Sequence, residues 1–197
     1  MAGRLLGQGE FPGYDTRPGV GVRAGLPDFD WVRIPAGEFL YGRRKKKRKI
    51  KEDFWITRFP VTYAQFETFL RAEDGFKNPQ WWKGLGADKD HRRTLGNQRF
   101  KYWNHPRERV SWYDAIAFSR WLTAKLEKYP ELLPTDLREE PQKWKITLPT
   151  EWQWERARAV LMGVGIRGET NMKVDGPMWM NQELSKPPII ICRKPAP

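Results

Sequence analysis

Three helix-start sequences constrain the fold of this chain more than any other feature, because each fixes where a helix begins. Each is a hydroxyl residue followed three positions later by glutamine or aspartate: Thr62 with Gln65, Ser111 with Asp114, and Thr150 with Gln153. The hydroxyl accepts a hydrogen bond from a free backbone N–H of the first turn, and the later side chain accepts one from the N–H of the capping residue. Apolar residues follow each start at helical spacing. We therefore predict three helices, each with its apolar face in the core.

Short runs of aromatic and β-branched residues indicate the strands. Residues 29–35 alternate in polarity, residues 39–42 follow after a turn, and residues 54–59 form a third run that Pro60 stops. A further run, 145–147, ends just before the third helix start. The sequence therefore predicts short strands combined with helices.

The composition is that of one globular domain. The 197 residues are only 39% apolar, but they include 11 Trp, 10 Phe and 6 Tyr, and each aromatic side chain buries a large area. The start of the chain lacks the apolar stretch of a signal peptide, and no segment reaches membrane-spanning length. We expect a soluble, cytoplasmic protein with no membrane partner.

A run of seven cations, Arg43 to Lys49, carries much of the net charge of +12. Such a run repels itself and resists burial, so it predicts a solvated loop between two strands. The alternative is a contact with nucleic acid or another anionic surface. Neither interleaved aromatics nor a recognition helix accompanies the run, so the exposed loop is the preferred interpretation.

Four segments carry a family resemblance, and they occur in order along the chain. They are "WVRIPAGEFLYG" (31–42), "FWITRFPVTYAQFETFL" (54–70), "HPRERVSWYDAIAFSRWLTAKL" (105–126) and "ITLPTEWQWERA" (146–157). Together they resemble the N-terminal half of the formylglycine-generating enzyme family, also called sulfatase-modifying factors. The chain departs from the family at Tyr41-Gly42, where Met-Gly is usual. The resemblance implies an α+β fold of the irregular C-type-lectin-like kind, with small antiparallel sheets and two to three helices.

After Ala157 the sequence no longer follows the family pattern, so the chain looks truncated. We divide it into an extended lead-in (1–28), a formylglycine-generating-enzyme-like domain (29–157) and a divergent tail (158–197). One hypothesis is a single-base shift near codon 158. Met and Trp each have a single codon, so they fix some residues of the neighbouring reading frame, and those residues resemble the family's next segment. The alternative is a natural short relative with its own tail. For either origin of the tail, we expect the apolar patch 189–191 to form a short strand or to stay mobile.

The chemistry of the family depends on ligands that this chain lacks. The resemblance implies copper held by two cysteine thiolates, which suits Cu(I), and a calcium site in the second half of full-length relatives. This chain has one cysteine, Cys192, which does not match the family's cysteine motif and leaves no partner for a disulfide within the chain. His91 and His105 are too few and too far apart for a three-ligand iron site. We expect no catalytic residue, no metal site and no cofactor in this chain.

Four aromatic residues on the long central loops are the candidate ligand-binding residues: Trp81, Trp82, Tyr102 and Trp103. Aromatics on loops form platforms for peptides or sugars, and the alternative is that they pack the loops onto the core. Two functions follow. The first is a sulfatase-modifying-factor-like protein without oxidase activity. The second is a lectin-fold binding module whose variable loops capture a protein or peptide ligand.

Overall fold

A computed structural model describes residues 15, 17–87, 95–162 and 190–193. The strands are β1 (Val22–Arg23), β2 (Leu26–Pro27), β3 (Trp31–Ile34), β4 (Gly37–Tyr41), β5 (Lys46–Ile50), β6 (Phe54–Thr57), β7 (Trp144–Thr147) and β8 (Ile190–Arg193). The α-helices are α2 (Tyr63–Arg71), α3 (Trp112–Lys128) and α4 (Glu151–Met162). Four short 3-10 turns accompany them: η1 (Pro79–Trp82), η2 (Pro130–Leu132), η3 (Thr135–Leu137) and η4 (Pro141–Lys143). Small antiparallel sheets and three helices in the described residues make this an α+β fold, as predicted.

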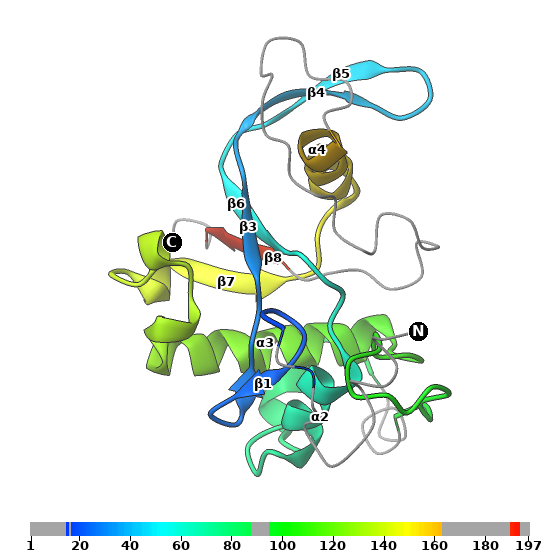
Figure 1. Cartoon of the computed structure of the whole chain (residues 1–197), viewed down its shortest axis with the longest axis vertical. Helices are drawn as coiled ribbons and strands as arrows, with labels where there is room; N and C mark the ends of the chain where they lie inside the picture. The colour runs from blue at the N-terminus through cyan, green and yellow to red at the C-terminus, as the bar shows by residue number, and fades with distance from the viewer. Residues whose placement is uncertain (1–14, 16, 88–94, 163–189, 194–197) are drawn as a thin grey trace.

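A four-stranded antiparallel sheet in the order β3-β6-β8-β7 forms the centre of the molecule (Figure 1). β8 comes from the part of the chain predicted as a divergent tail and lies between β6 and β7, where Ile191 is in register with Trp55 on one side and Ile146 on the other. The patch at 189–191 therefore contributes residues to a strand, which was one of the two predicted outcomes.

The helices begin where the capping sequences predict. Thr62 accepts from the backbone N–H of Gln65, and the Gln65 side chain accepts from the backbone N–H of Thr62. Ser111 with Asp114 and Thr150 with Gln153 make the same reciprocal pair of bonds. Each box satisfies backbone donors that a helix end leaves free.

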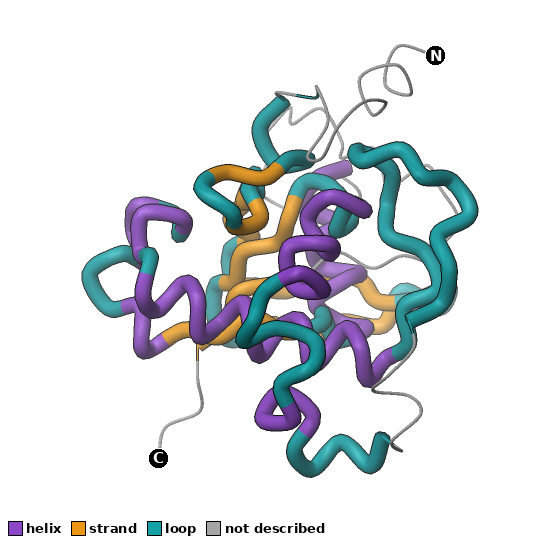
Figure 2. Tube along the Cα trace, turned by 90° about the horizontal axis from the view of Figure 1, so that it is seen from below, coloured by secondary structure: helices purple, strands orange, loops and turns teal. Residues whose placement is uncertain are grey.

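The sheet separates two hydrophobic clusters. Along β6, Trp55 belongs to the larger cluster with α2 and α3, whereas Phe54 and Ile56 belong to the smaller one with Ala157 and Leu161 of α4. This alternation is the period of a strand buried on both faces. In Figure 1, α2 and α3 accordingly cover one side of the sheet and α4 lies on the other, and Figure 2, seen from below, shows helices in front of the strands.

A buried arginine ties α4 to the turn between β3 and β4. The Arg156 side chain is 1% exposed and donates to the carbonyl oxygens of Pro35, Ala36 and Glu38 at 2.9–3.2 Å. Gly37, in the same turn, has a φ of +145°, and a Cβ placed there would lie 2.8 Å from the Arg156 guanidinium. Glycine is required at this position both for its backbone conformation and for the space that Arg156 occupies.

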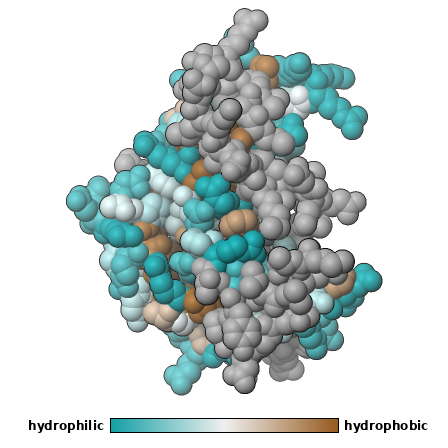
Figure 3. Space-filling view, in the orientation of Figure 1, coloured by the Kyte–Doolittle hydropathy of each residue, from teal (hydrophilic) through white to brown (hydrophobic). Residues whose placement is uncertain are grey.

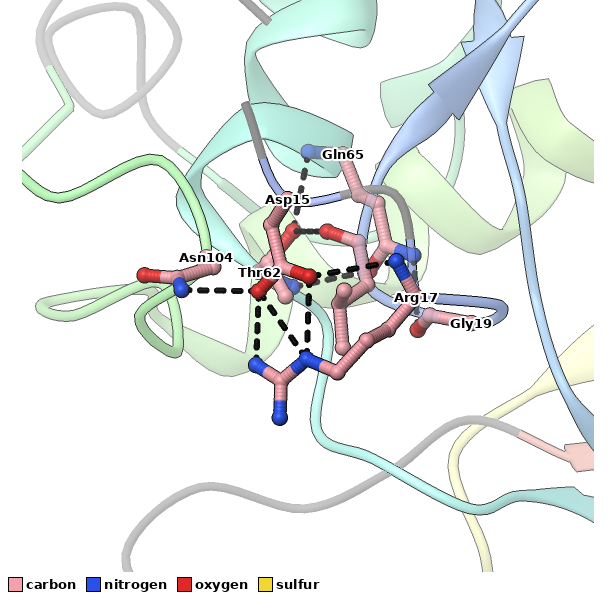
Figure 4. A network of polar contacts seen from close by, with 7 residues as sticks. Asp15, Arg17, Gly19, Thr62, Gln65 and Asn104 are labelled. Atoms are coloured by element: carbon pink, nitrogen blue, oxygen red, sulfur yellow. Dashed lines mark hydrogen bonds and ion pairs between the residues drawn. The ribbon is translucent and has the colours of Figure 1, made fainter. Parts of the chain in front are cut away.

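The lead-in is more structured than the sequence suggested. Its described residues include the hairpin β1–β2, and Gln65 donates from its side chain to the carbonyl oxygens of Gly19 and Asp28. Thr62 donates from its hydroxyl to the Val20 carbonyl. Figure 4 shows how this segment and the start of α2 are joined. The sequence has no period here because the segment is held by these polar contacts together with only two buried aliphatic side chains in its described part, Val20 and Leu26.

The prediction of a basic loop from Arg43 to Lys49 is wrong for most of its length. Lys46–Ile50 is strand β5, paired with β4 in a two-stranded ribbon, and only residues 43–45 form the turn. The ribbon projects from the body, so cations on its strands remain solvated (Figure 1). The charge argument excludes burial, but it does not exclude pairing of exposed strands. Within the described residues, no helix is both long and apolar enough to cross a membrane.

Candidate functional site

A cavity of about 540 Å³ lies where the starts of α2 and α3 meet the turn before α4. Its apolar lining consists of Pro60, Val61, Phe66, Val110, Trp112, Ala115, Phe118 and Leu148. Its polar lining consists of Arg99, Arg107, Glu108, Arg109 and Ser111. Three arginines against one carboxylate give the cavity a positive balance.

Backbone hydrogen bonds hold the wall of this cavity against α2. The N–H groups of Tyr63 and Ala64 donate to the carbonyls of His105 and Trp103 at 2.7 and 2.9 Å, and Arg107 N–H donates to Val61 at 2.9 Å. These bonds satisfy donors in the first turn of α2 that have no partner within the helix. The loop that carries the arginines is therefore positioned by the helix start.

Arg107 is the buried cation of the site, with only 8% of the residue exposed. It donates to the Gln98 side chain at 2.8 Å and to the Gly96 carbonyl at 2.9 Å, and its guanidinium carbon lies 5.5 Å from the Tyr63 ring centroid. Its Nε is buried and has no acceptor among the described residues. Burial lowers the pKa of Arg107, and nearby Glu67 opposes that shift.

Neighbouring residues fix the other charges. The Glu108 carboxylate accepts from the backbone N–H groups of Arg99 and Phe100, which leaves the exposed side chains of Arg99 and Arg109 as the less constrained charged groups. Arg109 has a φ of +52°, and a Cβ at Gly96 would lie 2.6 Å from the Arg109 Cβ. Gly96 is thus needed for the loop to pass this close to the cavity wall.

Trp81 and Trp82 pack onto the core through η1. Trp82 is 3% exposed, and its indole N–H donates to the Phe76 carbonyl at 2.9 Å. The Trp81 indole N–H donates to the Asp74 carbonyl at 2.6 Å. Arg120 of α3 donates to the Trp81 carbonyl. These contacts explain how the loop is held, while ligand binding by the two tryptophans stays a prediction.

Tyr102 and Trp103 contact other residues, at the start of α2 and in the loop before α3. The Trp103 ring stacks on Tyr63 at 4.8 Å, and Tyr63 in turn lies beneath the Arg107 guanidinium. Tyr102 contacts His105, with ring centroids 5.1 Å apart. The four candidates thus form two pairs with different partners, and the second pair is linked to the cavity through Tyr63. Their role in binding stays a prediction.

The sequence analysis missed the cavity residues themselves. Arg107-Glu108-Arg109 lies one residue before the capping residue Ser111, so a charged triplet near a helix start was the available signal. It was overlooked because nothing in the local spacing shows that Val61 and Leu148 come to the same place.

The donor set does not fit the family's copper site. Copper there is held by two thiolates, and the single cysteine, Cys192, lies on β8 in register with Lys145. Over the ranges that the structure covers, no three His, Cys, Asp or Glu residues gather closely enough to hold a metal ion. His91 lies outside the described residues, and His105 contacts Phe100 and Tyr102.

Comparison with known protein families gives one match. A family model described as "Sulfatase-modifying factor enzyme 1-like domain" matches residues 23–179. The match begins in β1, covers every described element through α4, and continues beyond residue 157, where the sequence resemblance ends. No curated protein is a match for the chain.

Proposed function

This chain belongs to the sulfatase-modifying factor enzyme 1-like family, and on that premise we propose that it is a member without oxidase activity. We further propose that the α+β structure is the C-type-lectin-like fold of the family. The observation that carries the functional proposal is the cysteine count. One thiol cannot supply the two thiolates that hold copper, so the chain alone has no site at which oxygen is activated.

The experiment is a direct assay for aldehyde. The full chain is incubated with copper and a cysteine-bearing peptide of the sulfatase type, and the peptide is probed with an aminooxy reagent. An active formylglycine-generating enzyme serves as the positive control. We expect no aldehyde above the background of peptide and copper alone. Aldehyde that forms with this chain and disappears in Cys192→Ser would show that the proposal is wrong.

A second function, ligand binding, is favoured by the cavity between α2 and α3. The three arginines select an anionic group, and the apolar lining selects a hydrophobic body beside it. Arg99 and Arg109 are the arginines nearest to solvent in this set, since Arg107 is already bonded to Gln98 and Gly96. We propose that the chain binds a peptide or small molecule in which a carboxylate adjoins an aromatic or aliphatic group.

A pair of probes tests this proposal. N-acetylphenylalanine and its amide differ in one charge, and both are titrated against the full chain by NMR. We expect the acid to bind at least fivefold more tightly than the amide, and Arg109→Ala to remove that preference. Arg44→Ala, at the turn of the β4–β5 ribbon, is the matched control and should retain it. Equal binding of acid and amide would contradict the proposal.

A further inference from the structure

The β4–β5 ribbon, here called the basic ribbon (residues 37–50), is a second surface with a distinct chemistry. Gly37–Tyr41 pairs with Lys46–Ile50 along five registered positions, and the ribbon projects over α4 (Figure 1). The hydrophilic side chains of this region extend from the body in Figure 3. One face of the ribbon lies toward α4 and buries Phe39, which leaves the other face and the strand edges open to a partner.

The exposed cations of the basic ribbon form no ion pairs within the described structure, although the carboxylates of Glu151 and Glu155 on α4 lie near Tyr41 of the ribbon. Six of its cations are exposed: Arg43, Arg44, Lys45, Lys46, Lys47 and Lys49. None of them forms an ion pair with a carboxylate among the described residues, whereas arginines elsewhere, such as Arg33 with Asp53, do. The one acidic residue on the ribbon strands, Glu38, lies opposite Lys49. A dense cationic surface of this kind attracts a polyanion.

An aromatic residue from a distant part of the sequence lies beside these charges. Trp152, in the first turn of α4, is 43% exposed. The Arg48 guanidinium carbon lies 5.2 Å from the Trp152 ring centroid, and the Tyr41 ring is 6.4 Å away. Exposed aromatic rings beside cations are the features that bind unpaired bases and phosphates together.

A hollow of about 390 Å³ continues this surface between the ribbon and α4. Leu40, Gly42, Arg43 and Lys45 line it from the ribbon, and Glu155, Arg158 and Ala159 line it from the helix. Three cations and one carboxylate give the hollow a positive balance, as on the ribbon itself. The positively charged surface of the basic ribbon therefore continues onto α4.

We propose that the basic ribbon and Trp152 form a binding site for single-stranded nucleic acid. The cations contact successive phosphates, and an unstacked base lies on the exposed part of the Trp152 ring. A duplex satisfies the cations equally well, but its bases are stacked inside the helix and unavailable to Trp152. The proposal rests on neither the missing oxidase activity nor the cavity between α2 and α3.

The test measures binding of fluorescein-labelled dT20 to the full chain by anisotropy over a range of salt concentrations. A 20-bp duplex, polyglutamate and vesicles of anionic lipid are the comparison polyanions. We expect dT20 to bind at least fivefold more tightly than the duplex, with affinity falling steeply as salt rises. Equal binding of dT20 and duplex, or preferential binding of polyglutamate or vesicles, would overturn the proposal.

Two pairs of variants separate stacking from charge. Trp152→Ala should weaken dT20 binding at least fivefold and leave the salt dependence unchanged, while the control Tyr129→Ala, an exposed aromatic residue at the C-terminal end of α3, should bind like wild type. Trp152→Leu keeps an apolar contact on α4 and should show the same loss if Trp152→Ala is poorly folded. A wild-type affinity in both Trp152 variants would contradict base stacking.

The charge of the ribbon is tested with the double variant Lys47→Gln/Lys49→Gln. The control is the double variant Lys77→Gln/Lys128→Gln, and all four lysines are exposed. Because each phosphate contact on a single strand contributes about 0.7 to the slope of log K against log salt, the ribbon pair should reduce that slope by roughly 1.4. The control pair should leave it unchanged. An equal reduction in both pairs would show that net charge, rather than this ribbon, determines the binding.

Discussion

Two charged side chains, Arg156 and Asp74, hold distant segments together by hydrogen bonds. Arg156 spans the turn between β3 and β4 with four bonds to three carbonyls. Asp74 accepts from the Trp121 indole at 3.2 Å and from Lys125 at 2.7 Å, which joins the loop after α2 to α3. Bonds of this kind are strong because one partner is charged.

Replacing Arg156 tests the first of these contacts. Arg156→Lys keeps the charge but loses the planar group that reaches several carbonyls at once, so buried acceptors are left without donors. We expect the variant to lose about 2 kcal/mol of stability, a fall in Tm of roughly 4–8 °C in a thermal melt followed by circular dichroism. Arg158→Lys, two residues further along α4 with a half-exposed side chain, should melt like wild type. A melt of Arg156→Lys identical to wild type would show that a single ammonium group suffices.

The pH dependence of stability tests the second contact. The hydrogen bond from Lys125 holds the pKa of Asp74 below its usual value of 3.8. A carboxyl with a lowered folded pKa stabilises the fold above its unfolded pKa, and this contribution is lost as the pH falls through the folded pKa. We therefore expect Asp74→Asn to lower Tm at pH 7, with the difference from wild type disappearing below about pH 3.8. If the difference in Tm between Asp74→Asn and wild type is the same at pH 7 and below pH 3.8, the carboxylate is not its cause. The control is Asp136→Asn, an exposed position, which should leave Tm unchanged at both pH values.

The helices differ in what their capping residues contact beyond the helix itself. Thr62 is 2% exposed and bonds both to the first turn of α2 and to the Val20 carbonyl of the lead-in (Figure 4). Thr150 is exposed, and the hydrogen bonds described for its side chain are all with Gln153 of its own capping box. The capping box therefore only caps the helix at α4, whereas at α2 it caps the helix and also holds the lead-in.

This difference gives a matched pair of substitutions. Thr150→Ala should cost about 1 kcal/mol, the usual value of a cap, whereas Thr62→Ala also leaves the Val20 carbonyl without its donor and should cost about 2 kcal/mol or more. In thermal melts this is a fall of roughly 2–4 °C against roughly 4–8 °C. Equal losses in the two variants would mean that the contact with the lead-in contributes nothing measurable.

Local signals predicted the elements, and tertiary contacts decided the rest. The capping boxes at Thr62, Ser111 and Thr150 placed all three helix starts, because a cap is encoded within four residues. The family was recognised from segments that cover most of the described core. The cavity and the basic ribbon were not predicted, because both depend on residues that are far apart in sequence. Leu148 and Arg109, about 40 positions apart, line the same cavity, and Trp152 and Arg48, about 100 positions apart, are in contact.

The central sheet joins the two hydrophobic clusters of the molecule into one body. β6 supplies side chains to both, and β8 pairs with β6 on one edge and with β7 on the other. Without β8 the described strands β6 and β7 would have no hydrogen-bonded connection across the sheet. The hydrogen-bonded continuity of the central sheet therefore depends on the four residues Ile190–Arg193.

A proline in β8 tests this dependence. Ile191→Pro removes a backbone donor from a central strand, where proline is not tolerated, while Ile191→Val keeps the backbone and a β-branched side chain. We expect Ile191→Pro to lower Tm by more than 10 °C or to abolish the cooperative transition, and Ile191→Val to change Tm by only a few degrees. A cooperative melt near the wild-type Tm in Ile191→Pro would show that the sheet is complete without β8.

The position of β8 also has a consequence for synthesis on the ribosome. β6 and β7 emerge long before the strand that bridges them, so each exposes an unpaired edge while the intervening residues are translated. Such edges pair readily with other chains, and long-range strand pairing is slow. A nascent chain of this protein is thus vulnerable to association with its neighbours on a polysome until Arg193 has left the exit tunnel, and chaperone binding during that interval would have a clear physical target.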